Sequence, residues 1–214
     1  KWLGLVFAVL ISITYGLVFN SVQANTISFA FENAFGIGRT SVAIALFVLT
    51  GVVIFGGIHR IASISEKIVP FMPVLYVLIV LGVLAININK LPGIIVLIVK
   101  SAFGPEQFMG GALGAAVMQG IKRGLFSNEA GMGSAPNAAA TAHVTHPVKQ
   151  GLVQTLAVFT DTLIVCSATA FLILVSGTYQ TSSADGIALT QEALTSQIGS
   201  FGGPFVAICI FLFA

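Results

Sequence analysis

The stretch FMGGALGAAVMQGIKRGLFSNEAGMGSAPNAAATA, residues 108–142, decides the fold. It opens with an apolar helix of small residues over 108–121, about 21 Å long at 1.5 Å per residue and too short to cross a bilayer. Glycines and polar residues that no lipid-facing helix would keep then follow: Gly124, Ser127, Asn128, Glu129, Gly131 and Gly133. We therefore predict a discontinuous helix over about residues 108–142.

The second half of this helix is predicted to begin at Ser134, whose hydroxyl would cap free N–H groups, with Pro136 in the first turn. Two half-helices that meet head to tail leave unpaired carbonyls on one and unpaired N–H groups on the other. Secondary transporters use such ends to hold a cation and a zwitterionic substrate near the middle of the membrane. The alternative is a kink repaired by neighbouring helices and buried water. The glycines beside Asn128 and Glu129 favour a binding site.

The composition places the whole chain in a membrane. Of its 214 residues, 57% are hydrophobic and 7% are charged, and the mean hydropathy is +1.03. Soluble domains carry about 25% charged residues, so a soluble globular enzyme is excluded. The net charge of +2 is small and scattered, which excludes a nucleic-acid partner.

The apolar segments predict an all-α integral membrane protein, because their hydrophobicity does not alternate as in membrane strands. Residues 91–102 are too few to span and are expected to form an interfacial or re-entrant helix. A short amphipathic helix around residues 189–198 is expected to lie over the bundle. The charged cluster at 59–67 is expected on the cytoplasmic side. Spans are predicted at residues 2–32, 40–58, 68–88 and 151–175 and from 201 onward.

The chain begins at Lys1 without a methionine and stops within an apolar run at Ala214. We therefore expect residues 1–214 to be a single transmembrane domain truncated at both ends, an internal fragment of a longer chain.

Three stretches carry a resemblance to a known family. GIKRGLFSNEAGMGSAPNAAATA, residues 120–142, closely resembles the signature of the sodium:alanine (alanine or glycine:cation) symporter family. FTDTLIVCSATAF at 159–171 and FNSVQANTISFAF at 19–31 are also similar to that family. The resemblance implies a leucine-transporter-type inverted-repeat helical bundle, in which the broken helix resembles the sixth core helix. The family's glycine-rich broken first helix does not occur in this sequence, so we expect missing parts of the same chain to complete the bundle and the site.

A substrate site is predicted at the break and on one face of the first span. The polar stripe on that span recurs at three- and four-residue steps, although helix packing is the alternative explanation. Carbonyls and side-chain oxygens near residues 126–128 would meet the substrate amine, and the substrate side chain would lie against the methionine and neighbouring glycines. The candidate substrate-binding residues are Asn20, Gln23, Phe126, Ser127, Asn128, Gly131, Met132 and Gly133.

The candidate cation-binding residues are Asn128, Glu129 and Asp161. Glu129 could equally cap a helix start. A lone charge in a span costs at least about 2.5 kcal/mol, so Asp161 needs a partner, and an ion pair with Lys122 or Arg123 is favoured over a cation relay. Sodium is the expected coupling ion, with no other metal and no cofactor.

The remaining reactive side chains suggest no chemistry. Cys166 and Cys209 lie in apolar segments and are expected to be buried without a disulfide. His143 and His146 precede a proline without a third ligand, so a loop is favoured over a zinc site. Ser127 has no nucleophile elbow around it, so a hydrolase is not expected.

We therefore expect no enzyme and no catalytic residue, but a secondary active transporter that imports a small neutral amino acid, alanine or glycine, with sodium by alternating access. Small size follows from the glycine and alanine crowding over 110–142. The expected location is the plasma (inner) membrane, with lipid, sodium and the amino acid as partners. Rivals are a transporter of the same architecture for another small solute, a channel and a non-transporting membrane subunit.

Overall fold

The computed structural model describes residues 2–68, 70–103, 112–129 and 131–213, and their regular structure is helical throughout. The helices form two compact units. Unit 1 comprises Lys1–Ile86 and Leu172–Ala214, and unit 2 comprises Asn87–Phe171. The first residues of the predicted discontinuous helix, 108–111, lie outside the described residues.

Four helical stretches are long and apolar enough to cross a membrane: Trp2–Phe35, Gly57–Ile86, Pro147–Ser176 and Ile187–Phe213. They confirm the long apolar helices predicted at residues 2–32, 68–88 and 151–175, and the last one includes the segment predicted from residue 201. Large apolar side chains along these helices are widely exposed. A surface of that extent suits lipid or further apolar helices and not water.

Two boundaries differ from the predicted ones. The second span was expected at 40–58, but α3 covers only Arg39–Ile54 because Gly56 and Gly57, the latter at φ 74°, turn the chain. The cluster at 59–67 lies within a helix, α4 (Gly57–Ile68), which is followed by α5 (Phe71–Ile86). Helix α4 concentrates its apolar residues on one face, so its charges do not interrupt it.

Unit 1 begins with one long helix that contains a π-helical segment. It consists of α1 (Trp2–Ile13), the π segment η1 (Thr14–Phe19) and α2 (Asn20–Phe35), and it ends at Gly36 with φ 68°. Toward its other end unit 1 holds the last residues of α11 (Ser167–Ser176), α12 (Thr178–Thr181), α13 (Ile187–Ile198), the 3-10 segment η4 (Gly199–Phe201) and α14 (Gly202–Phe213).

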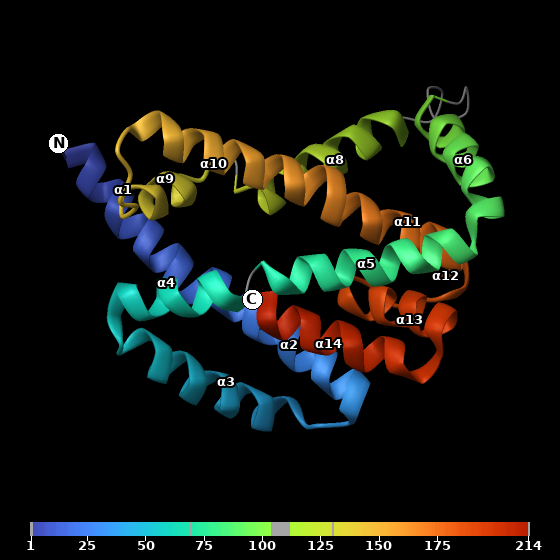
Figure 1. Cartoon of the computed structure of the whole chain (residues 1–214), viewed down its shortest axis with the longest axis horizontal. Coiled ribbons are helices and arrows are strands. Elements are labelled where there is room, and N and C mark those ends of the chain that lie inside the picture. The colour runs from blue at the N-terminus through green and yellow to red at the C-terminus, as the bar shows by residue number, and fades with distance from the viewer. Residues whose placement is uncertain (1, 69, 104–111, 130, 214) are drawn as a thin grey trace. The chain divides into compact units, whose positions relative to one another are not determined.

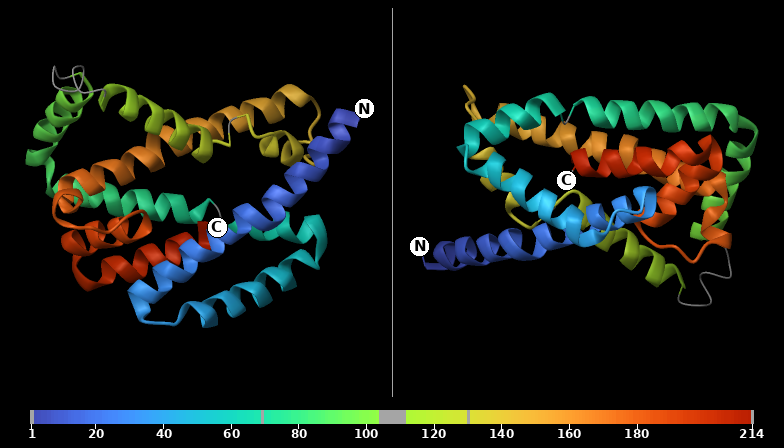
Figure 2. Two further views of the ribbon diagram at one scale, coloured as in Figure 1. Left: turned by 180° about the vertical axis from the view of Figure 1, so that it is seen from behind. Right: turned by 90° about the horizontal axis from the view of Figure 1, so that it is seen from below.

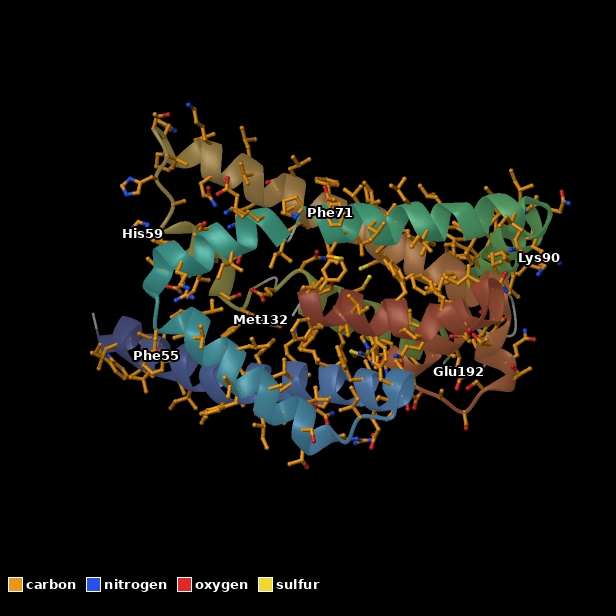
Figure 3. All side chains as sticks on the ribbon, turned by 60° about the horizontal axis from the view of Figure 1, so that its bottom comes forward. Phe55, His59, Phe71, Lys90, Met132 and Glu192 are labelled. Atoms are coloured by element: carbon orange, nitrogen blue, oxygen red, sulfur yellow. The ribbon has the colours of Figure 1, made fainter. Side chains whose placement is uncertain are left out.

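The core of unit 1 lies where α2, α13 and α14 meet (Figure 1). Ala30 of α2, Ala193 and Leu194 of α13 and Ala207 of α14 have no exposed surface. Helix α13 is the amphipathic helix predicted at 189–198, and its exposed side carries Glu192, labelled in Figure 3. The prediction of a short helix in this segment is therefore confirmed, whereas the expectation that it would lie over the bundle is wrong, because α13 contributes buried residues to the core of unit 1.

A buried glutamine ties these three helices together. Gln191 of α13 is 4% exposed, and its Nε2 donates to the carbonyl of Ala30 at 2.9 Å and to that of Gly203 at 3.3 Å. Its Oε1 is buried without a hydrogen-bond partner among the described residues. The sequence pattern of α13 gave no sign of this buried amide.

Unit 2 runs from the 3-10 segment η2 (Ile88–Lys90) through α6 (Leu91–Phe103), α8 (Ala112–Ser127), α9 (Ser134–Ala139) and α10 (Pro147–Phe159). A second π segment, η3 (Thr160–Cys166), then leads into α11. The short helix expected at 91–102 is thus present as α6. Figure 2 shows the bend in the chain between α8 and α10, where α9 lies. His146 begins α10 by accepting a hydrogen bond from the backbone N–H of Val148 at 3.2 Å.

Candidate functional site

The candidate site centres on the loop between α8 and α9, where Met132 lies (Figure 3). Helix α8 ends at Ser127, and α9 begins at Ser134. Gly131 and Gly133 have φ angles of 78° and 82°, a left-handed conformation that glycine adopts without steric cost. Glu129 has φ 49° and is the sole non-glycine residue with a positive φ in the described ranges. The backbone at this point is therefore held in a conformation that a helix cannot have.

The side chain of Glu129 is engaged with the start of the second half-helix. The hydroxyl of Ser134 donates a hydrogen bond to Oε2 of Glu129. Ser134 does not cap α9 as predicted, because Gly133 holds the cap position and no side chain bonds there. The serine is already the first helical residue, so its hydroxyl reaches back to the carboxylate.

Two adjacent residues of η3 bond the last residue of α8 and the residue that follows it. The hydroxyl of Ser127 donates to Oδ2 of Asp161 at 2.7 Å, and the hydroxyl of Thr162 donates to Oδ1 of Asn128 at 2.9 Å. Asp161 was expected to pair with Lys122 or Arg123, and that expectation is wrong. Among the described residues the ion pair that forms is Glu32 with Arg39, while the serine hydroxyl faces Asp161.

Cys166 was expected to be buried, and it is exposed. Its Sγ lies 3.8 Å from Oγ of Ser127 and 3.9 Å from Oδ2 of Asp161. The π segment causes this placement, because i→i+5 spacing brings residues 161 and 166 onto one face. Cys209 is buried as expected, and both cysteines are free.

The candidates on the first span lie in unit 1. Asn20 is the first residue of α2, directly after η1, and its Nδ2 approaches the carbonyl of Gly16 at 3.4 Å. Gln23 lies one turn further along the same helix and is exposed. Ser127, Asn128 and Asp161 come together in unit 2, Glu129 and Ser134 form a second contact, and Phe126 is exposed on the last turn of α8.

A groove of about 680 Å³ lies in unit 2 beyond the loop, between α9 and the start of α10. Small side chains such as Ala135, Ala139 and Gly151 line it, together with the amides of Gln150 and Gln154. No charged side chain is among its lining residues in the described part of unit 2.

The described residues contain no group of three potential metal ligands from histidine, cysteine, aspartate and glutamate. His146 acts as a helix cap, so its Nδ1 is already committed to the backbone. A zinc-type centre therefore has no donor set in this part of the protein.

Sequence reasoning missed Thr162 and the position of Cys166. Thr162 directly follows Asp161, and the four-residue run FTDT places three hydrogen-bonding side chains in a row inside a span. That polar run was the available signal. Its partners could not be read from the sequence because they lie 34 positions away.

Comparison with known proteins gives a consistent result. A model described as the sodium:alanine symporter family matches residues 1–214. The chain is 57% identical over 213 residues to the probable sodium/glutamine symporter GlnT of Bacillus subtilis, covering 100% of this chain and 45% of that protein.

Two further relatives are the amino-acid carrier protein AlsT of Bacillus subtilis and the sodium/proton-dependent alanine carrier protein of Bacillus sp. strain PS3. The chain is 54% identical to AlsT, and the match covers 100% of this chain and 46% of AlsT. It is 41% identical to the alanine carrier protein, and that match covers 95% of this chain and 49% of the carrier. The chain thus spans about half the length of the curated relatives it matches.

Proposed function

The chain belongs to the sodium:alanine symporter family, and from that premise we propose that it is part of a multi-pass membrane transporter that imports a small neutral amino acid with sodium. The family and the relatives' names support a transporter and not an enzyme. The proposed substrates are alanine and glycine, the proposed location is the plasma membrane, and the proposed mechanism is alternating access around a fixed site. We further propose that residues 1–214 form one portion of a leucine-transporter-type bundle that the rest of the polypeptide completes.

The observation that carries the proposal is the approach of Asp161 to the end of α8. A helix C-terminus carries a partial negative charge and unpaired carbonyls. The carboxylate of Asp161 lies at this end through its bond to Ser127, and it forms no ion pair among the described residues. Two negative groups side by side are unfavourable unless a cation lies between them. A sodium ion fits that requirement because it binds carboxylate, carbonyl and hydroxyl oxygens.

The substrate is proposed to bind at the same break, with Phe126, Ser127, Asn128, Gly131, Met132 and Gly133 around it. Asn20 and Gln23 on the first span stay candidate substrate-binding residues. Glu129 and Asn128 are the other candidate cation ligands. Small side chains along the groove beyond the loop are consistent with a small neutral amino acid.

Uptake of labelled alanine by the full-length transporter in liposomes tests this proposal. We expect uptake to require an inward sodium gradient. Asp161→Asn keeps an oxygen for the Ser127 hydroxyl but removes the charge, so the half-saturating sodium concentration should rise at least about tenfold, as expected when a carboxylate that contacts the cation loses its charge. Asp185→Asn is the matched control, because Asp185 is exposed outside the four long helices. Uptake that is unaffected when choline replaces sodium would sink the coupling.

The second carboxylate is tested in the same assay. Glu129→Gln keeps an acceptor for the Ser134 hydroxyl, so the loop should hold while the charge is lost. If Glu129 helps to bind sodium, half-saturation should again shift to higher sodium, and Glu192→Gln on the exposed face of α13 should have no effect. An unchanged sodium dependence would assign Glu129 to stabilising the loop alone.

The substrate is assigned by a panel of labelled alanine, glycine and glutamine. Glutamine belongs in the panel because one relative is named a sodium/glutamine symporter. Preferred glutamine uptake would replace the substrate assignment and leave the sodium coupling intact.

A further inference from the structure

We propose that Thr162 is a positioning residue that fixes the side-chain amide of Asn128, so that Asn128 donates its N–H groups to the carboxylate of the amino-acid substrate and does not coordinate sodium. This inference rests on the proposed function. It separates two roles that the sequence left together at Asn128.

The hydroxyl of Thr162 behaves differently from those of its neighbours on the same long helix. The hydroxyls of Thr155 and Thr160 donate to carbonyls four residues back in their own helix, both at 2.9 Å. This back-bonding satisfies a threonine without any outside partner. Thr162 instead donates to a side chain at the end of α8, at 2.9 Å. Its hydroxyl is thus committed to Asn128.

The bond decides which end of the amide faces the ligand. A side-chain amide has one oxygen that accepts and one NH₂ group that donates. Oδ1 of Asn128 accepts the Thr162 hydroxyl on one of its two lone pairs, and Nδ2 donates no hydrogen bond within the described part of the chain. The group with its full capacity open is therefore the NH₂ donor, which suits a carboxylate and repels a metal cation.

The neighbouring pair completes this division of roles. Ser127 bonds Asp161, and its neighbour Asn128 bonds Thr162, the neighbour of Asp161. The Ser127–Asp161 pair therefore presents a carboxylate, and the Asn128–Thr162 pair presents an N–H donor. A sodium ion and a substrate carboxylate have opposite charges, so adjacent sites of this kind suit simultaneous binding.

The test measures two constants in the full-length transporter in liposomes, the KM for alanine and the half-saturating sodium concentration. Thr162→Val keeps the shape and removes the hydroxyl, and Thr162→Ser restores it. Thr160→Val is the matched control, because the hydroxyl it removes bonds only the carbonyl of Leu156 in the described structure. Asn128→Asp is a second variant that replaces the donor by an oxygen and does not depend on how Thr162→Val folds.

We expect Thr162→Val to raise the KM for alanine about tenfold, as for loss of one hydrogen bond to a charged group, with sodium half-saturation within about twofold of the unmodified protein. Thr162→Ser and Thr160→Val should match the unmodified protein. Asn128→Asp should raise the alanine KM at least as much and should not weaken sodium binding.

Three results would overturn the inference. The first is an unchanged alanine KM in Thr162→Val, and the second is a higher half-saturating sodium concentration in that variant, whether or not its KM for alanine rises. The third is an unaltered alanine KM in Asn128→Asp. If the unmodified transporter shows no sodium-dependent uptake, the proposed function fails and this inference fails with it. If uptake is intact and only the variants behave otherwise than expected, the inference alone fails.

Discussion

The hydroxyl of Ser127 and the carboxylate of Asp161 form a hydrogen bond of 2.7 Å across 34 positions of sequence. Ser127 is the last residue of α8, and Asp161 is the second residue of the π segment η3. The bond therefore joins the end of an interrupted helix to the one stretch of the following helix that departs from α geometry. π segments occur frequently at functional sites, in agreement with the proposed location of binding.

Cys166 should report directly on binding at this place. A maleimide should label Cys166, which is exposed beside Ser127, and should not label Cys209, which is 3% exposed. Sodium and alanine at about ten times their dissociation constants should slow labelling roughly tenfold, in proportion to the unoccupied fraction. Mass spectrometry of the labelled peptides measures both rates, with Cys166→Ser as the blank. Equal labelling of Cys166 with and without both ligands would place the ligands elsewhere.

Gln191 should be more important for stability than its polar character suggests. Gln191→Glu removes the donor and leaves three oxygens facing one another in a buried place, those of Ala30, Gly203 and the new side chain. We expect a loss of about 3 kcal/mol in the free energy of unfolding, the cost of a buried charge without a partner. Thermal unfolding in detergent checks this, and Glu192→Gln, a change of charge on the exposed face of the same helix, should unfold at the unmodified temperature. A variant as stable as the control would show that the carbonyls of Ala30 and Gly203 do not need this amide.

The start of α14 provides a matched pair of glycines. A Cβ at Gly202 would lie 2.5 Å from the backbone N of Thr195 and 2.6 Å from the carbonyl carbon of Leu194, whereas a Cβ at Gly203 would meet Thr195 Oγ1 at 3.5 Å. Gly202→Ala should therefore destabilise the protein by about 1–3 kcal/mol, because backbone atoms of α13 would have to move. Gly203→Ala should be tolerated. The difference in unfolding temperature between the two variants measures the effect, and equal temperatures would contradict the close packing of α13 on α14.

Composition accounts for much of the architecture. Long apolar runs predict the helices that begin at Trp2 and Pro147 and the one that ends at Ile86, and the glycines around Asn128 mark the interval between α8 and α9. These features depend on residue type and local order alone, which a single sequence contains. The end of α3 was predicted too late because Gly56 and Gly57 lie in an apolar run that hides the turn.

The contacts that define the candidate site could not be predicted in the same way. Asp161 was assigned a cationic partner because charge is the property visible in a sequence, but its partner is a neutral hydroxyl. Cys166 was assigned to the interior because its neighbours are apolar, and the π segment turns it toward Ser127. Gln191 lies on a helix of mixed polarity, where burial depends on α14, which folds back onto α13, and on α2, whose Ala30 is 161 positions away.

The π segment η3 lets one additional residue fit between Asp161 and Cys166. In an α-helix, residues five apart differ by about 140° around the axis, so Asp161 and Cys166 would point in different directions. The segment brings them within 3.9 Å by accommodating additional backbone in one turn. Removal of a single amino acid between them would leave the aspartate and the cysteine four residues apart in a regular α-helix, about 40° apart around the axis, and the residues beyond would keep their register. The extra residue thus lets the helix change its winding at the site while the side chains beyond it keep their directions.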